Sequence, residues 1–383
     1  MKVLLINAVC GIKSTGRICI DIAKQYEDMG AEVKIAYGRD DVPEKYEKYA
    51  VRIGTTKDVY YHAFMSKVFG DRGYWSRNAT KKFLEWADQY NPDILWLHNI
   101  HDYFINIEML FDWIKSRKNM KIKWTHHDCW AFTGYCGYFS HIGCEKWKKE
   151  CNNCYYSKKE HLPLIDNTKR NYYKNKELFT GIENLIMITP SQWLADLIKQ
   201  SYLGEYEVKV LHNRIDKSIF RPTYGNFRDE YNINDKFMIL GVASPWSDRK
   251  GLNDFIKMSC LLKENYIIVL VGVNKKQKRK LPHNIIGITR TDSASKLAEI
   301  YTAADVFVNP TYEDNYPTTN LEAQACGTPV ITYRTGGSPE SVPDKNICEQ
   351  GNIEEIVNKI INKQYYGALN LTNEEEWTRI SEI

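Results

Sequence analysis

Two carboxylates stand eight positions apart in the last quarter of the chain, in a segment that reads as a loop followed by a helix. Asp314 closes a loop after a predicted strand at 306–309, and Glu322 lies one turn inside the helix. Pro317 suits the start of that helix, because its missing N–H costs nothing there. The first-turn amides at 318–320 would then be free to bind a phosphate, while the carboxylates bind hydroxyls. For Glu322 alone, the plainer explanation is an acid favoured by the helix dipole.

A pair of cations is expected at the same edge of the same sheet. Arg249 and Lys250 come just after a predicted strand at 237–243 and just before a helix. In open parallel sheets, ligands bind beyond the carboxyl ends of the strands. The position therefore favours a role in binding, although an Arg-Lys pair on a surface is usually only solvated.

A short glycine loop, Gly11 to Arg17, separates the first predicted strand (3–9) from the first helix. In one interpretation, free amides of Ser14 to Arg17 face an anion at a helix N-terminus. In the other, Gly16 simply lets the helix pack closely on the strand. The sequence leaves both interpretations open.

Histidines follow two of the next predicted strands. His98 comes after a strand at 94–97, with His101 close behind, and His126 and His127 follow a strand at 122–125. Adjacent residues at a strand end point to opposite sides, so one of the pair 126–127 could be a packed core histidine. His98 and His101 are candidates for positioning groups or for contacts with a second substrate.

Four cysteines fall within 19 residues: Cys136, Cys144, Cys151 and Cys154. Four thiols at such spacing suit a tetrahedral structural zinc site. The alternative is a set of unligated thiols in a surface insertion, because a disulfide is not expected in a reducing compartment. The spacing of the first three is not a common zinc-finger pattern, so both hypotheses stand.

Strands alternate with helices along the whole chain, which predicts an α/β protein of two doubly wound parallel-sheet (Rossmann-like) domains facing a central cleft. We expect an N-terminal domain over 1–210 with a cysteine-rich insertion near 129–156, and a C-terminal domain over 211–362. The segment 363–383 could return to the first domain. The charged stretch between Arg214 and Lys236 is the expected linker.

Composition excludes several classes of protein. A content of 43% hydrophobic and 26% charged residues is typical of a globular protein. A net charge of +4 is too small to indicate a nucleic-acid-binding protein by itself. The longest apolar run, Tyr266 to Val273, falls far short of the ~20 residues of a membrane span. Met1 leads directly into a strand pattern without a signal peptide, so a cytoplasmic protein is expected.

Basic and aromatic side chains alternate over residues 64–83, including Lys67, Arg72, Trp75 and Lys81. A basic amphipathic segment can lie on an anionic membrane surface, here the inner face of the membrane. A solvated helix is the plainer interpretation.

The second half of the chain resembles the signature of retaining nucleotide-sugar glycosyltransferases of the GT-B fold. Its elements are Lys250-Gly251 after the first strand of the domain, the acids Asp314 and Glu322, and the run Ala323 to Val330. The first half resembles a bacterial branch that makes capsular, exopolysaccharide or lipopolysaccharide chains. The matching segments are Ser14–Arg17, Pro92–Phe104, Trp124–Cys136 and Thr189–Ala195. His212–Phe220 resembles the segment that enters the second domain.

The resemblance implies a role for each matching residue. Glu322 would hold the ribose hydroxyls of the nucleotide, Asp314 would contact the donor sugar and Lys250 would neutralise the diphosphate. The first acid of the family is usually glutamate, so the shorter Asp314 puts this sugar contact in doubt. The family usually has an arginine five residues before the lysine, where this chain has Pro245; Arg249 is the candidate substitute.

The same resemblance implies that amides of Thr318, Thr319 and the Gly16 loop complete the phosphate site, and that His127 lies under the donor sugar. His98 and His101 would stand on the acceptor side. No catalytic metal is expected, because cations and amides take its place. Arg214 replaces a glycine that is common in the family, with no clear consequence.

The sequence therefore predicts a retaining glycosyltransferase, a hexosyltransferase of class EC 2.4, that uses a UDP- or GDP-linked sugar and a saccharide or lipid-linked acceptor. A nicotinamide-dependent oxidoreductase is the first alternative, and the incomplete glycine fingerprint counts against it. A zinc-dependent nucleic-acid binder is the second, and the small net charge counts against it.

Overall fold

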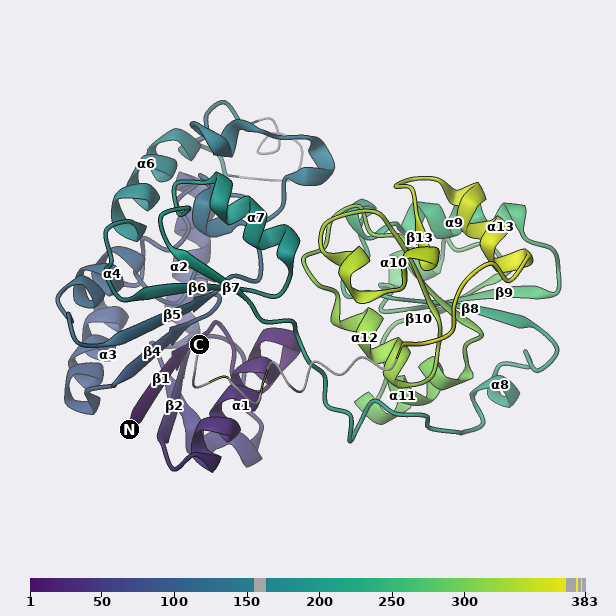
Figure 1. Ribbon diagram of the computed structural model, residues 1–383, viewed down its shortest axis with the longest axis horizontal. Coiled ribbons are helices and arrows are strands. Elements are labelled where there is room, and N and C mark those ends of the chain that lie inside the picture. Colours follow the sequence, from purple (N-terminus) through teal and green to yellow (C-terminus); the bar gives the residue numbers. More distant parts are fainter. Residues whose placement is uncertain (155–162, 370–376, 378–379, 381–383) are drawn as a thin grey trace. The chain divides into compact units, whose positions relative to one another are not determined.

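The computed structural model describes residues 1–154, 163–369, 377 and 380. The chain divides into two compact units (Figure 1): unit 1 is formed by residues 1–212 with 376–383, and unit 2 by residues 213–375. Each unit is built on one parallel sheet with helices against both of its faces. The predicted α/β class and the two Rossmann-like sheets are confirmed.

The sheet of unit 1 has seven strands. Across the sheet they are β3 (Ala50–Arg52), β2 (Glu32–Tyr37), β1 (Lys2–Ile6), β4 (Ile94–Leu97), β5 (Lys121–Thr125), β6 (Leu185–Thr189) and β7 (Glu207–Val210). The helices are α1 (Lys13–Asp28), α2 (Thr56–Phe69), α3 (Arg77–Tyr90), α4 (Ile107–Lys115), α6 (Thr168–Phe179) and α7 (Gln192–Gln200).

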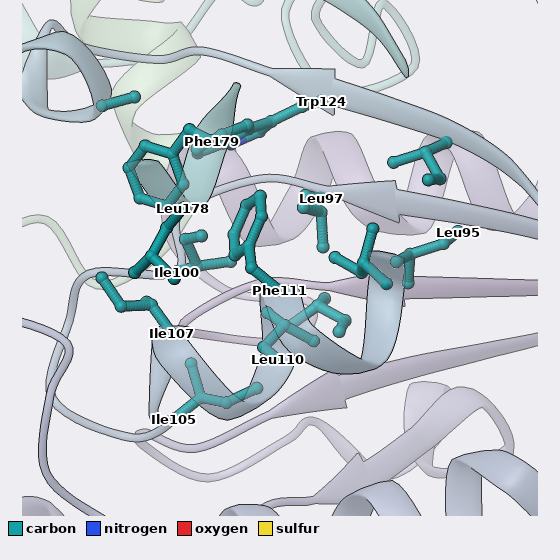
Figure 2. Packing of buried hydrophobic residues seen from close by; sticks show 14 of the residues in the cluster. Leu95, Leu97, Ile100, Ile105, Ile107, Leu110, Phe111, Trp124, Leu178 and Phe179 are labelled. Atoms are coloured by element: carbon teal, nitrogen blue, oxygen red, sulfur yellow. The ribbon is translucent and has the colours of Figure 1, made fainter. Parts of the chain in front are cut away.

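Both faces of this sheet are buried, which explains why its strands read as continuous apolar runs. Along β1, Leu4 and Ile6 pack in one hydrophobic cluster, while Val3 and Leu5 pack in another on the opposite face. In the first cluster the ring of Phe111 lies 4.6 Å from that of Phe179 (Figure 2). Each fully buried side chain of this kind contributes about 1.5–3 kcal/mol.

The sheet of unit 2 has six strands. Across the sheet they are β10 (Ile285–Ile288), β9 (Tyr266–Val271), β8 (Phe237–Val242), β11 (Val306–Asn309), β12 (Val330–Tyr333) and β13 (Ile347–Cys348). The helices are α8 (Phe227–Glu230), α9 (Leu252–Leu261), α10 (Lys275–Lys278), α11 (Ala294–Ala303), α12 (Thr318–Ala325) and α13 (Ile353–Ile361).

The order of the strands places two loop pairs together. In unit 1 the chain builds the sheet outward from β1 to β3 on one side and then from β4 through β5 on the other, so the strand order reverses between β1 and β4. In unit 2 the corresponding reversal falls between β8 and β11. Crevices at such reversals, beyond the carboxyl ends of the strands, are where open α/β sheets bind ligands. The loops that follow β8 and β11 are therefore neighbours, as are those that follow β4 and β5.

Two details of the predicted elements are wrong. The first strand ends at Ile6, not at residue 9, because Asn7 turns back to donate its side-chain amide to the carbonyl of Val9 at 2.8 Å. The edge strands β3, β7 and β13 were not predicted. β3 and β13 have only three and two residues, and β7 alternates charged residues with valines instead of forming an apolar run.

The expected linker between Arg214 and Lys236 is not a free connection but part of unit 2. Phe220, Phe227 and Ile233 are buried in one of its hydrophobic clusters. The stretch contains the short helix α8, and Arg228 pairs with Asp305 at 2.6 Å. The stretch is therefore a packed segment of unit 2, although many of its residues are charged.

The basic and aromatic stretch at 64–83 is not one amphipathic helix. Helix α2 ends at Phe69 and α3 begins at Arg77. Between them, Arg72 lies against the rings of Tyr103 and Tyr135, at 5.7 and 4.6 Å. In the parts of the chain that the structure describes, no helix is long and apolar enough to cross a membrane.

Candidate active site

Lys250 and Asp314 meet, although 64 positions separate them in the sequence. Lys250 ends the short 3₁₀ helix η5 (Asp248–Lys250) after β8, and Asp314 lies in the loop after β11. The ammonium Nζ lies 2.5 Å from Oδ2 of Asp314. Both side chains are largely but not fully buried, with 24% and 15% of their surfaces exposed. The pair therefore stays within reach of a ligand.

Arg249 holds the loop that carries Asp314. Its guanidinium donates to the backbone carbonyl of Glu313, and its own carbonyl accepts from the amide of Tyr312 at 2.8 Å. The arginine expected to substitute for the missing family cation is thus engaged in fixing the acid loop. Glu313 itself is fully buried.

Two glycines allow the backbones around this pair to approach closely. Gly251 has φ +75°, and a Cβ there would lie 2.2 Å from the carbonyl oxygen of Pro310. Gly336 has φ +55°, and a Cβ there would lie 1.9 Å from the carbonyl oxygen of Asp314. That same oxygen accepts from the amide of Gly337 at 3.0 Å. Any other residue at either position would displace the loop.

The first turn of α12 offers two backbone donors. The helix begins at Thr318, and the amides of Thr318 and Thr319 have no partner among the described residues. The amide of Asn320 is not free, contrary to the sequence prediction, because it donates to the carbonyl of Pro317 at 3.1 Å. The Asn320 side chain is buried and bonded to Asn309, so it braces the helix.

Glu322 is buried on α12, with 8% of its surface exposed. Its Oε2 accepts from the hydroxyl of Tyr301 on α11 at 3.0 Å. Burial, then the charge of Glu322, raises the pKa of Tyr301 well above its usual value. Glu322 therefore already accepts one hydrogen bond from a core side chain.

In unit 1, His98 and His127 face one another from the loops after β4 and β5. Nδ1 of His98 lies 3.0 Å from Nε2 of His127, and the rings stack with centroids 5.3 Å apart. His98 is buried against the ring of Trp96, while His127 is half-buried. Burial lowers the pKa of His127 to about 4, and burial and then the charge of His127 lower the pKa of His98 well below its usual value. Both imidazoles are therefore neutral at pH 7.

A second contact ties the same two loops together. Nε2 of His101 lies 3.2 Å from Oδ2 of Asp128, whose Oδ1 accepts from the amide of Trp130 at 2.9 Å. Burial acts to lower the pKa of His101, but the Asp128 carboxylate outweighs it and the pKa is raised. The pKa of Asp128 falls to about 2 because this partner and the Trp130 amide outweigh its burial. An ionic pair thus stands beside a neutral one.

His126 is the packed histidine of the adjacent pair. It is buried, with Nε2 at 3.0 Å from the sulfur of Met187 and its ring 4.5 Å from that of Trp124. Burial lowers its pKa to about 3. The contacts of His98 and His101 with the loop after β5 favour positioning roles over direct contact with an acceptor.

Gly16 serves close packing. It is buried in α1, and a Cβ there would lie 3.1 Å from the amide nitrogen of Gly11 and 3.1 Å from Cγ2 of Val9. Because α1 begins at Lys13, its free first-turn amides are those of residues 13–15. The predicted anion site at 14–17 therefore loses the amides of Gly16 and Arg17, which lie in the next turn.

The four clustered cysteines are neighbours, and none forms a disulfide. Burial, and then the charges of Cys151, Cys154 and Cys144, raise the pKa of Cys136 well above its usual value. Across residues 1–154 and 163–369, however, no group of three or more His, Cys, Asp or Glu side chains is placed to hold a metal ion. The described geometry does not support the predicted zinc site.

Three residues at these sites escaped sequence reasoning. Tyr301 has no spacing relation to Glu322, so only the packing of α11 on α12 reveals it. Asp128 follows His127 directly but was not given a role. Gly336 belongs to a Gly-Gly pair after β12, which is a turn signal that could have found it.

Comparison with known proteins finds a family model that matches part of unit 2. Residues 224–363 match the family described as "Glycosyl transferases group 1". The matched residues all lie in unit 2 and make up about a third of the chain. A protein of Escherichia coli (strain K12), whose name assigns it provisionally to colanic acid biosynthesis as a glycosyl transferase, is 25% identical over 256 residues. That alignment covers 65% of this chain and 62% of the relative, so the chain spans less than two thirds of the relative's length.

Solved structures extend the likeness to both units and show the GT-B fold. Sucrose-phosphate synthase from Thermosynechococcus elongatus has a TM-score of 0.68 at 14% identity, covering 94% of this chain and 89% of that one. Anabaena HepE, solved in complex with UDP-glucose, has a TM-score of 0.61 at 16% identity and covers 95% and 89%. The matched region, residues 224–363, contains Lys250, Asp314 and Glu322. The match favours a transferase over the oxidoreductase and the nucleic-acid binder.

Proposed function

We propose that this protein transfers a sugar, with retention of anomeric configuration, from a UDP- or GDP-linked donor to a saccharide or lipid-linked acceptor in cell-surface polysaccharide synthesis. The observation that carries the proposal is the contact between Lys250 and Asp314 inside the region that matches the group 1 glycosyl transferases. The relative named for colanic acid biosynthesis and the Anabaena complex with UDP-glucose support this choice of acceptor and donor.

The proposed roles in unit 2 follow from the charge that the reaction creates. Breaking the bond between the anomeric carbon and the diphosphate leaves negative charge on the departing phosphate. Lys250 and the open amides of Thr318 and Thr319 stabilise that charge without reorganising, because they are already held in place. Asp314 accepts from a hydroxyl of the donor sugar, and Glu322 accepts from the ribose hydroxyls.

In unit 1, His127 contacts the donor sugar. Its half-buried ring leaves one edge accessible, and its low pKa makes it a neutral hydrogen-bonding group in the physiological range. His101 pairs with Asp128, which follows His127 in the sequence. This pair holds the backbone of the loop that carries His127.

A turnover assay with a matched pair of variants tests the proposal. Purified protein is incubated with a panel of UDP- and GDP-linked sugars and lipid-linked saccharides, and nucleoside diphosphate release and the anomeric configuration of the product are measured. Asp314→Asn should abolish release, whereas Asp235→Asn, at an exposed position of the same unit, should not. Inverted products, or no turnover of any donor, would contradict the proposal.

We also propose that α2 touches an anionic membrane surface when the acceptor is lipid-linked. One face of α2 exposes Tyr60, Tyr61 and Phe64, at 72%, 54% and 64%, with Lys57 and Lys67 at its two ends. Aromatic rings favour the membrane interface and lysines are attracted to anionic lipids, which supports this contact.

Vesicle sedimentation tests this membrane contact. The protein should bind vesicles that contain an anionic phospholipid better than vesicles of a zwitterionic one. The double change Tyr60→Ser with Phe64→Ser should lower that binding, whereas Tyr224→Ser, at a 91% exposed ring in unit 2, should leave it unchanged. Equal binding by all forms would exclude the α2 face.

A further inference from the structure

One buried nitrogen beside the proposed donor-sugar contact lacks a partner. In the part of the chain that the structure describes, the buried side-chain nitrogen and oxygen atoms without a hydrogen-bond partner are Nε2 of His98 and Nε of Arg72. The other nitrogen of His98, Nδ1, faces Nε2 of His127 at 3.0 Å. The two nitrogens of His98 therefore have very different surroundings, and this difference decides where its proton sits.

A neutral imidazole carries one proton, on either Nδ1 or Nε2. With the proton on Nε2, His98 would bury an N–H group that has no acceptor, and orphaned N–H donors are the rarer kind of unsatisfied group in proteins. With the proton on Nδ1, His98 donates to His127, and only a lone pair is left unused at Nε2. The second arrangement leaves every buried N–H of the pair with an acceptor.

The tautomer of His98 determines that of His127. If Nε2 of His127 accepts the hydrogen bond, its single proton must lie on Nδ1. His127 is half-buried, and its Nδ1 is not among the buried atoms without a partner. That nitrogen is therefore at the accessible edge of the ring, where a ligand oxygen could receive its proton in a hydrogen bond.

We propose that His98 is a positioning residue, which donates from Nδ1 to Nε2 of His127 and thereby holds His127 as a neutral donor, with Nδ1–H directed at an oxygen of the sugar substrate. This inference rests on the proposed function for the nature of the ligand. The tautomers are a property of the free protein, so that part of the inference is independent of the proposed function. It also means that His127 has no lone pair available to take a proton from the acceptor hydroxyl.

The surroundings hold this arrangement in place. Trp96 stacks on His98 with ring centroids 6.0 Å apart, and the indole of Trp124 donates to the carbonyl of His98 at 3.3 Å. On the other side, the ion pair of His101 with Asp128 fixes the residue after His127. The titratable groups that face the pair are His101, Asp128 and His126. The ring of His98 therefore cannot turn without losing its stacking on Trp96.

Nitrogen NMR of the free protein, labelled with ¹⁵N in histidine, reads the tautomers directly. We expect a protonated Nδ1 and a bare Nε2 for both His98 and His127, with signals assigned by their loss in His98→Asn and His127→Asn. A proton on Nε2 of either residue would overturn the proposal, whatever reaction the protein catalyses.

Three substitutions at position 98 separate positioning from structural support. His98→Asn keeps an amide donor at the position of Nδ1 and should retain most of the turnover. His98→Phe keeps the flat ring on Trp96 but has no donor, and should lower turnover about tenfold, as expected for one lost hydrogen bond. His98→Asp offers only an acceptor, so it should draw the proton onto Nε2 of His127, raise the pKa of that ring and shift the acid limb of the pH–rate profile upward.

Nucleotide affinity is the matched readout, because nothing in this pair is proposed to touch the nucleotide. It should stay unchanged in all three variants. Equal turnover of His98→Phe and the wild type would overturn the proposal, as would an Asn variant that is as impaired as the Phe variant. If the Phe variant does not fold, the wild-type spectrum still decides the tautomers.

Discussion

Glu322 has two partners in this account, a buried tyrosine in the protein and a hydroxyl of the ligand, and substitutions can separate them. Glu322→Gln keeps an oxygen for the Tyr301 hydroxyl, so it should change stability little while weakening the bond to the ligand. Glu322→Ala should in addition cost about 1–3 kcal/mol, because it strands the buried hydroxyl. Urea unfolding of both variants measures the difference. Equal stability of the two would show that Tyr301 does not depend on Glu322.

Buried neutral histidines make the protein sensitive to acid. Burial lowers the pKa of His126 to about 3 and that of His127 to about 4, from 6.5. Below pH 6.5 these two histidines bind protons in the unfolded chain but not in the folded one. Their contribution to the free energy of unfolding is therefore complete above pH 6.5 and is lost as the pH falls toward 4. Between pH 7 and 5 we expect the free energy of unfolding to drop by about 1–2 kcal/mol for each.

The pH dependence can be assigned by substitution. His126→Phe has no proton to bind, so its unfolding free energy should fall less steeply between pH 7 and 5 than that of the wild type. His101 acts in the opposite sense, since its pKa is raised: its contribution is complete at low pH and fades as the pH rises through its folded value. An unchanged slope in His126→Phe would mean that other groups bind the protons.

At the scale of elements, the loop after β11 is held in place by backbone contacts that only glycine permits. Gly336→Ala adds a methyl group whose carbon would lie only 1.9 Å from the carbonyl oxygen of Asp314. It should therefore displace Asp314 and abolish most turnover. Gly327→Ala is the matched control: its φ of +86° is also positive and at least as strained for a residue with a Cβ, but the nearest atom to the new Cβ is 3.9 Å away. Its stability should fall by about 1 kcal/mol with activity retained.

Steady-state turnover and thermal unfolding of these two glycine variants distinguish strain from displacement. Comparable losses of activity in both would show that positive φ alone, and not the approach to Asp314, sets the geometry of the loop.

The alternation of strands and helices predicted the elements well, because buried parallel strands read as short apolar runs with polar residues at their ends. The same logic predicted that Lys250 and Asp314 would share an edge, since strand ends in a parallel sheet converge. It could not predict that β8 and β11 are neighbours, which depends on the order of strands across the sheet. The partners of Glu322 and Asp128 also escaped it, because helix packing and loop conformation determine side-chain contacts that no spacing encodes.

At the scale of the whole molecule, catalysis should not depend on a divalent metal. In the proposed function, Lys250 and the first-turn amides of α12 take the phosphate charge in place of a metal. Activity should therefore survive an excess of EDTA. A rapid loss that magnesium or manganese restores, with no change in circular dichroism, would show that a metal shares the task.

The central claim is that unit 2 binds a nucleoside diphosphate through Lys250 and Glu322, and calorimetric titration of the full chain tests it most directly. UDP or GDP should bind with about one equivalent, and Glu322→Gln should weaken that affinity about tenfold or more, the effect of losing a charged hydrogen bond. Lys250→Met should weaken it as well, through the loss of a charge at the diphosphate. Failure of both nucleotides to bind the wild type, or equal affinity in the wild type and Glu322→Gln, would contradict the account.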